Sequence, residues 1–268
     1  MALAAAVFLL LAGYLFLIAP ARRGRDLSAL KGYPYAHRGL YGNEKGVPEN
    51  SMAAFQKAAE AECGIELDVQ LTTDHRLVVF HDRSLSRMCG QAGDVMDAPY
   101  SKIKECTLLS TAERIPLFSE VLDMVDGRVP LIVEIKAYGS AAQAAEAAHA
   151  LLSRYNGPYC VESFHPLALR WFKKHAPQTV RGQLASGSIG KGEPYFAQAA
   201  LKYLLVNALS RPHFIAYDIR SGENISTFLV RKLFAPLWVA WTVRTPGDWE
   251  KAEKRYGLQI FEGRMPRR

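Results

Sequence analysis

The chain has 268 residues, of which 49% are hydrophobic and 22% are charged, and its formal net charge is +7. This composition excludes a disordered chain, and the length suits one large domain. Lysine and arginine form no run interleaved with aromatic residues, so we expect no nucleic-acid partner. The positive charge favours a surface beside anionic lipid, and a soluble basic protein is the alternative.

Residues 2–19 carry no charge, and about 18 to 20 apolar residues let a helix cross a bilayer. We therefore expect residues 1–25 to form a transmembrane anchor with a basic flank. Arg22, Arg23 and Arg25 follow the apolar run. The positive-inside rule then predicts a single-pass protein of the cell membrane whose main domain is cytoplasmic. A cleaved signal peptide and the reverse orientation are the alternatives.

After an expected linker at residues 26–32, residues 33–268 form one expected domain in which strand-like runs alternate with helical patterns. The candidate strands are residues 33–37, 64–72, 77–81, 130–136, 159–164, 180–185, 214–219, 237–243 and 258–262. The candidate helices are residues 51–62, 118–126, 140–155, 165–175, 192–203 and 246–256. This alternation is typical of a parallel sheet with helical crossovers.

The second and third strand-like runs are separated only by residues 73–76, which is too short for a parallel crossover. We expect a hairpin, and a turn centred between Asp74 and His75 would pair Asp68 with His81. Counting the hairpin as one position leaves eight parallel strands, the number that closes a (β/α)8 TIM barrel. A doubly wound open sheet is the alternative.

The four cysteines, Cys63, Cys89, Cys106 and Cys160, contain no C-x-x-C pair. They lie mostly in apolar or helical contexts. We interpret them as reduced, buried thiols in a reducing compartment, neither disulfide partners nor zinc ligands.

Acidic residues alternate with apolar ones in two of the candidate strands. The strand period of two places Glu66 and Asp68 on one face of residues 64–72, and Glu134 takes the same face of residues 130–136. The opposite, apolar faces pack on helices, so the three carboxylates are expected inside the barrel. Buried carboxylates repel one another unless a cation compensates.

Oxygen ligands without neighbouring cysteine suit Mg²⁺ or Ca²⁺ better than zinc. We therefore expect Glu66, Asp68 and Glu134 to hold a divalent cation. The alternative is a buried salt-bridge network with Lys136 and Arg38.

Two histidines end strands at the face where barrel active sites are built, His37 after the first run and His81 after the third. With ordinary pKa values near 6.5, they can act as general base and general acid. Arg38 and Lys136, together with a divalent cation, would neutralise a phosphate. The set fits cleavage of a phosphodiester.

The residues resemble the glycerophosphodiester phosphodiesterases, a family of the phospholipase C-like phosphodiesterase superfamily. The resemblance covers about residues 33–263 and rests on motifs in this order: His37-Arg38-Gly39, Glu49-Asn50-Ser51, Glu66-Leu67-Asp68, His81-Asp82 and Glu134-Ile135-Lys136. "ESF", "GQL" and "WTV" match less distinctively.

The resemblance implies a TIM barrel, a metal on Glu66, Asp68 and Glu134, and an acid/base pair of His37 and His81. It also implies that Arg38 and Lys136 contact phosphate, and that Glu49 and Trp241 shape a glycerol pocket. Two of these readings have structural alternatives. Asn50 or Ser51 fits the N-cap of the following helix, and Trp241 fits the barrel core.

The implied activity is metal-dependent hydrolysis of glycerophosphodiesters, such as glycerophosphocholine or glycerophosphoethanolamine, to sn-glycerol 3-phosphate and an alcohol. The membrane anchor expected at the N-terminus suggests a lysophospholipase D acting on membrane lysolipids as an alternative. A catalytically silent, membrane-anchored binding protein is a further alternative, against which the two histidines argue.

Overall fold

The computed structural model describes residues 1–22, 25–187 and 194–263. Nine strands form one sheet in the order β1-β9-β8-β7-β6-β5-β4-β2-β3, and β1 also pairs with β2. All pairs are parallel except β2 with β3. The sheet therefore closes into a barrel of eight parallel strands, with β3 outside it. The strands are β1 (Tyr35–His37), β2 (Gly64–Leu71), β3 (Leu77–Val79), β4 (Leu131–Ile135), β5 (Tyr159–Ser163), β6 (Arg181–Ala185), β7 (Phe214–Asp218), β8 (Leu237–Val243) and β9 (Leu258–Phe261).

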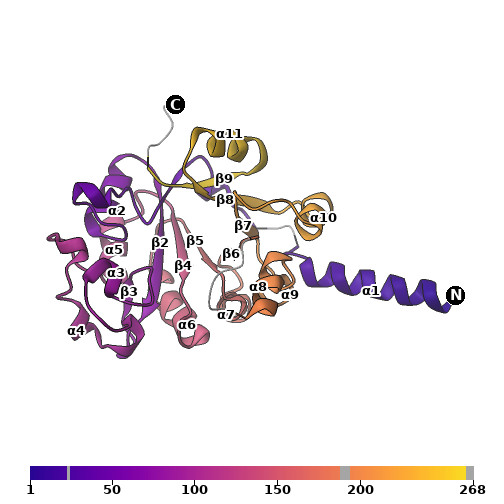
Figure 1. Cartoon of the computed structure of the whole chain (residues 1–268), viewed down its shortest axis with the longest axis horizontal. Coiled ribbons are helices and arrows are strands. Elements are labelled where there is room, and N and C mark those ends of the chain that lie inside the picture. Colours follow the sequence, from indigo (N-terminus) through magenta and orange to yellow (C-terminus); the bar gives the residue numbers. More distant parts are fainter. Residues whose placement is uncertain (23–24, 188–193, 264–268) are drawn as a thin grey trace.

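Helices surround this barrel, and one helix projects from it (Figure 1). The larger ones are α1 (Ala2–Ile18), α2 (Met52–Glu60), α5 (Phe118–Val125), α6 (Ala141–Leu152), α7 (Pro166–His175), α8 (Tyr195–Lys202), α10 (Ile225–Leu233) and α11 (Pro246–Arg255). The short ones are α3 (Ser86–Cys89), α4 (Tyr100–Ile103) and α9 (Asn207–Ser210). All nine predicted strands and the six predicted helices are found, with ends shifted by a few residues. Residues 192–193 of one predicted helix lie outside the described residues.

Helix α10 was not predicted. Its N-terminus does carry a sequence signal, because Asn224 accepts from the backbone N–H of Thr227 while the Thr227 hydroxyl accepts from the backbone N–H of Asn224. This reciprocal capping is a helix-start pattern.

The hairpin forms as predicted, but its register is one residue off. Val69 pairs with Val79 and Leu71 with Leu77, so Asp68 lies opposite Phe80, whose N–H donates to the Asp68 carbonyl at 2.9 Å. The reason is the turn, which has three residues between Thr72 and Arg76 and ends with His75 at φ 57°. Three-residue hairpin loops end in this left-handed conformation.

Strand alternation separates two apolar layers. Ile65, Leu67 and Val133 face outward and pack with Phe55 of α2 and Phe118 of α5. Ile132, Leu184, Phe214 and Val239 instead fill the barrel interior. The same alternation directs the acidic residues of β2 and β4 inward, as predicted.

The segment between β3 and β4 carries its own small core. Phe80, Met88, Val95, Ile103 and Leu108 pack together in it. This cluster supports the loops that border the C-terminal end of the barrel on the β2–β3 side.

The expected transmembrane helix is not found. Helix α1 has 17 residues. Across the described residues, no helix combines the length and the apolar character that crossing a membrane requires. The helix ends at Ile18 because Pro20 disfavours a helical conformation for Ala19, which is extended. Of the predicted basic flank, Arg23 lies outside the described residues.

The last turn of α1 is part of the folded domain. Ile18 is fully buried with Ile215, Val230 and Trp238. Asn207 donates to the Ile18 carbonyl at 2.8 Å, and Arg211 donates to the Ala19 carbonyl at 2.7 Å. The N-terminal part of α1 extends away from the barrel (Figure 1).

The four cysteines lie largely in the interior. Cys63, Cys106 and Cys160 are buried and Cys89 is half-buried. Burial raises the pKa of the Cys160 thiol well above its usual range. Burial also raises the pKa of Cys89 and of Cys106, so the thiol form of these three residues is favoured.

Gly182 on β6 provides a test of interior packing. A Cβ at this position would occupy the space of the Phe214 ring. We expect Gly182→Ala to lower the free energy of unfolding by about 1–3 kcal/mol, because overpacking displaces the ring. Urea denaturation measures this. Gly222→Ala is the control, since its Cβ would meet nothing within 4 Å; equal stability of the two variants would contradict the packing argument.

Candidate active site

Two strands, β2 and β4, bring the predicted acids together at the C-terminal end of the barrel, and β1 adds His37 beside them. His37 pairs with Glu66 across β1 and β2, and Asp68 pairs with Glu134 across β2 and β4. One carboxylate oxygen from each of Glu66, Asp68 and Glu134 lies within 4.8 Å of the other two. The parallel register therefore converts residues far apart in sequence into one cluster.

A fourth carboxylate extends this cluster. Glu162 on β5 pairs with Glu134, is 1% exposed, and its Oε2 has no hydrogen-bond partner among the described residues. Sequence reasoning missed it, although it lies in the "ESF" motif. Burial raises the pKa of Glu66 and of Glu162 well above the usual range, and the neighbouring carboxylates add to both shifts.

Lys136 and Arg38 offset part of this negative charge. The Lys136 ammonium lies 3.0 Å from Asp68 Oδ1 and 2.8 Å from Glu134 Oε1, and Arg38 Nε lies 3.5 Å from Asp68 Oδ2. Although burial opposes ionisation, these cations hold the pKa of Asp68 well below its usual range.

The salt bridges of the alternative interpretation are therefore present. However, Lys136 and Arg38 carry only two positive charges against the four buried carboxylates. A cluster of hard oxygen donors with surplus negative charge fits a divalent cation such as Mg²⁺ or Ca²⁺. Glu66, Asp68 and Glu134 are the residues that would hold it.

Backbone conformation helps to order the cluster. Arg38 has φ 59°, and its N–H donates to Glu66 Oε2 at 3.0 Å. Gly39 follows at φ 82°, and a Cβ there would meet the Ala54 backbone at 2.9 Å. The glycine is therefore required by the close approach of α2.

Asn50 is a positioning residue that the sequence analysis left undecided. It has φ 55°, is 1% exposed, and its Nδ2 donates to Asp68 Oδ2 at 2.8 Å. Ser51, not Asn50, caps α2, because its hydroxyl accepts from the Ala54 N–H. The Glu-Asn-Ser motif thus divides between the site and the helix start.

His37 forms a pair with Glu262, which the sequence analysis did not single out. Nδ1 of His37 lies 2.5 Å from Glu262 Oε1, and Nε2 lies 3.8 Å from Glu66 Oε2. Burial lowers the pKa of His37, and the hydrogen bond to Glu262 opposes that effect. Arg244 donates to both Glu262 oxygens, and together with His37 it lowers the pKa of Glu262 to about 2 although burial opposes ionisation.

His81 has a similar carboxylate partner. Nδ1 of His81 lies 2.7 Å from Asp82 Oδ1, and Arg87 holds both Asp82 oxygens, at 2.6 and 3.0 Å. Despite the register error, His81 lines the same cavity as His37, because the chain leaves the ladder after Val79 and turns toward the acids.

Glu49 lies behind Arg38 and Arg87. Arg38 donates to its Oε1 at 2.6 Å, and Arg87 donates to both of its oxygens. Burial by itself would raise the pKa of Glu49. The hydrogen bonds and positive charges of Arg87 and Arg38 outweigh this effect, so the pKa of Glu49 is lowered. Glu49 is 4% exposed; here it holds two arginines, and its predicted contact with glycerol stays a prediction.

A cavity of about 290 Å³ is lined by both histidines and by Glu66, Glu134 and Glu162 of the acidic cluster. Trp241 lines it and meets Phe164 edge to face, with ring centroids 5.5 Å apart. Trp241 thus forms part of the cavity wall as well as of the interior packing. The lining residues include His37, Arg38, Glu66, His81, Glu134, Lys136, Glu162, Asp218, Arg220, Trp241 and Arg244.

A closed (β/α)8 barrel with buried carboxylates, two histidines and several basic residues in one cavity at its C-terminal face defines a phosphodiesterase of the barrel type. Residues 37–259 match the glycerophosphoryl diester phosphodiesterase family. The chain therefore belongs to this family, as the motifs predicted.

Curated relatives carry the corresponding names. A glycerophosphodiester phosphodiesterase of Bacillus altitudinis is 41% identical over 109 residues, covering 38% of this chain and 43% of that protein. One from Caldanaerobacter subterraneus subsp. tengcongensis is 36% identical over 163 residues, covering 56% and 65%. Lysophospholipase D GDPD1 of Rattus norvegicus is 33% identical over 114 residues, covering 38% and 35%. The chain thus spans between about a third and two thirds of these relatives.

Solved structures share the fold. A glycerophosphodiester phosphodiesterase from Thermotoga maritima has a TM-score of 0.66 and 26% identity, covering 85% of this chain and 94% of that one. A phosphodiesterase from Oleispira antarctica, in complex with the product sn-glycerol-3-phosphate, has a TM-score of 0.69 and 22% identity, covering 87% and 93%.

The contact between Glu262 and His37 yields a test that needs no substrate. We expect Glu262→Gln to lower the pKa of His37 further, because the amide cannot stabilise the imidazolium while burial still disfavours it. Titration of the histidine ring signals by NMR measures this. Glu250→Gln, at an exposed pair with Lys254, should leave His37 unchanged, and an unaltered His37 pKa in Glu262→Gln would refute the pairing.

Proposed function

We propose that this protein is a metal-dependent glycerophosphodiester phosphodiesterase that releases sn-glycerol 3-phosphate and an alcohol, with glycerophosphocholine and glycerophosphoethanolamine as candidate substrates in glycerophospholipid metabolism. The observation that carries the proposal is the presence of two histidines, each held by a carboxylate, in the cavity that contains the acidic cluster. The family membership and the names of the relatives support it.

Arg38 and Lys136, which both line the cavity, bind the phosphate. A divalent cation on Glu66, Asp68 and Glu134 would supply further charge neutralisation at the phosphate. Asn50 and Lys136 hold Asp68 from two sides, at 2.8 and 3.0 Å. These contacts fix the carboxylate before substrate arrives.

Proton transfer falls to His37 and His81. Each ring uses Nδ1 for its carboxylate partner, which leaves Nε2 as the working atom. One Nε2 takes the proton of the attacking hydroxyl, and the other protonates the leaving oxygen. In line with the family resemblance, the attacking group is a neighbouring glycerol hydroxyl, and water completes the hydrolysis.

The activity is tested with the purified chain and glycerophosphocholine. We expect release of sn-glycerol 3-phosphate with Mg²⁺ or Ca²⁺, loss of release with chelator, and recovery on adding the metal back. His37→Ala and His81→Ala should each lower kcat by about 10²–10⁴-fold. His149→Ala is the control, because His149 packs on Trp171 away from the site.

Activity that persists in chelator would refute the metal assignment. Full activity in both site variants would refute the catalytic roles and favour a silent binding protein.

A second candidate function is that of a lysophospholipase D at a membrane, favoured by the exposed apolar surface of α1. Phe8, Leu9 and Leu10 are 68–75% exposed. Beside the base of α1, where Tyr14 bonds Ser226 at 2.7 Å, Ile225 and Phe228 of α10 are also exposed. Apolar surface of this extent favours contact with lipid. A cytoplasmic location at the cell membrane stays a proposal, supported by Arg22 and Arg25.

Membrane contact is tested with Phe8→Glu combined with Leu11→Glu, because the buried Ile18 makes removal of the whole helix a disruption of the barrel. We expect the wild type to float with anionic phosphatidylglycerol vesicles and the double variant to float several-fold less. Leu167→Glu, which changes an exposed apolar residue of α7, is the control. Equal flotation of all three would contradict the role of α1.

The same preparations separate the two candidate activities. A lysophospholipase D hydrolyses lysophosphatidylcholine faster than glycerophosphocholine, and faster in the wild type than in the double variant.

A further inference from the structure

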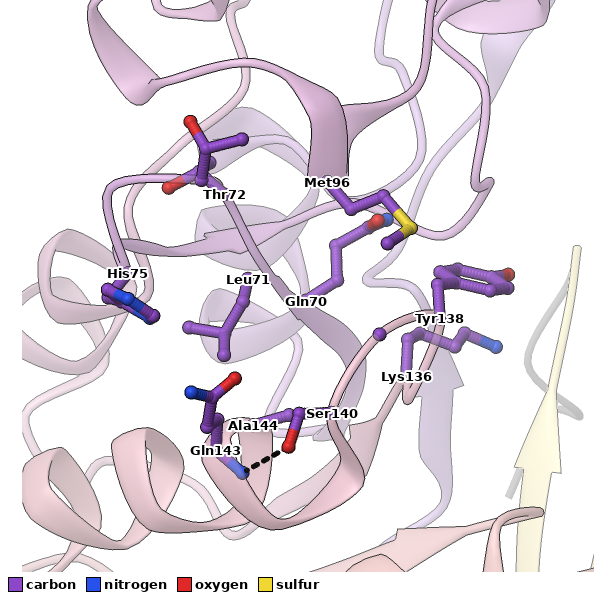
Figure 2. Close-up of a pocket in the computed structure, with 12 residues that line it drawn as sticks. Gln70, Leu71, Thr72, His75, Met96, Lys136, Tyr138, Ser140, Gln143 and Ala144 are labelled. Carbon is purple, nitrogen blue, oxygen red and sulfur yellow. Dashed lines mark hydrogen bonds between the residues drawn. The ribbon is translucent and has the colours of Figure 1, made fainter.

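A second cavity, of about 200 Å³, lies beside the active site (Figure 2). The β2–β3 hairpin, the short helix Val95–Asp97 and the segment from β4 into α6 form its walls. Lys136 lines both this cavity and the active-site cavity. Tyr138, another lining residue, donates its hydroxyl to the carbonyl of His81 at 3.1 Å. The two cavities are therefore neighbours across Lys136 and His81.

Gln70 gives this cavity a buried side-chain amide whose oxygen can still accept a hydrogen bond. The residue is 1% exposed, and its Nε2 donates to the carbonyls of Phe80 and Asp82, both at 2.8 Å. Its Oε1 has no hydrogen-bond partner in the part of the chain that the structure describes. Figure 2 shows the amide directed toward Met96. A buried acceptor without a partner is costly, and a donor entering the cavity would satisfy it.

The other lining groups restrict the chemistry of the occupant. Thr73, Ser140 and Gln143 supply hydroxyl and amide groups. No carboxylate is among the lining residues in the described ranges, and Tyr138 is the one Phe, Tyr or Trp side chain among them. Quaternary ammonium groups are bound by several aromatic faces or by anionic groups, so the cavity is a poor choline site. Uncharged hydroxyl groups match its donors and acceptors.

We propose that this cavity binds the alcohol half of the phosphodiester, and that the alcohol it fits is a small uncharged polyol such as glycerol. A diester whose phosphate lies on Arg38 and Lys136 would extend past Lys136 into the cavity, where a hydroxyl reaches Gln70 Oε1. This inference rests on the function proposed above and adds to it the class of leaving alcohol.

The test compares three substrates that share the glycerol 3-phosphate half: the glycerol, choline and methyl esters. The methyl group is too small to occupy the cavity, so its ester reports the chemistry alone. Met96 and Gln143 line this cavity and do not line the active-site cavity, so Met96→Trp and Gln143→Trp each reduce its volume, whereas Met96→Leu preserves it. Circular dichroism and thermal unfolding verify the fold of each variant, and Gln143→Trp, on the exposed first turn of α6, replaces Met96→Trp if that variant does not fold.

We expect both tryptophan variants to lower kcat/KM for the glycerol ester by about tenfold or more, mainly by raising KM. Their kcat/KM for the methyl ester should stay within about twofold of the wild-type value. For Met96→Leu, kcat/KM should stay within about twofold of the wild-type value on both esters. The wild type should prefer the glycerol ester over the choline ester by about two- to tenfold, which is the contribution of one satisfied hydrogen bond.

Three results would overturn the inference. Equal losses on the glycerol and methyl esters, or no loss on either, would show that the alcohol lies elsewhere. A wild type that hydrolyses the choline ester as well as the glycerol ester would refute the polyol assignment. A wild type inactive on all three esters refutes the proposed function itself, and so is distinguishable from both.

Discussion

The crowding of four carboxylates at the C-terminal end of the barrel is the constraint on which the rest of the site depends. Glu66, Asp68, Glu134 and Glu162 are all buried, and burial opposes the ionisation of each. Charges in such a place are tolerated only when paired or bound to a cation. Lys136 and Arg38 compensate part of the charge, and a bound divalent cation would compensate the rest.

The backbone around the cluster serves the same end. Arg38 and Asn50 both adopt left-handed conformations, which non-glycine residues adopt at a cost of about 1–3 kcal/mol. In return, an Arg38 N–H reaches Glu66 and an Asn50 amide reaches Asp68. The loop after β1 therefore orients two carboxylates, while Glu49 orients the arginines behind them.

Local pattern predicted the elements of this fold well, because strand alternation and turn residues depend on near neighbours. The local pattern was wrong for the hairpin register. The turn has three residues and is not centred between Asp74 and His75, so Phe80 lies opposite Asp68 in place of His81. The uncharged run at the N-terminus likewise predicted a transmembrane helix, for which the described residues contain no helix of sufficient length and apolar character; such a run says nothing of Ile18 docking against Trp238. Glu262 was missed because no motif links it to His37, 225 residues away in the chain.

By itself, the sequence determined the barrel class, the family and the identity of the main chemical groups, because strand period and motif order are local properties of the chain. Only the tertiary structure decided their partners: Glu262 for His37, Asn50 for Asp68, and Glu162 as the fourth carboxylate. The register of closed parallel strands sets these contacts. Such register depends on packing of the whole barrel, which no short stretch of sequence specifies.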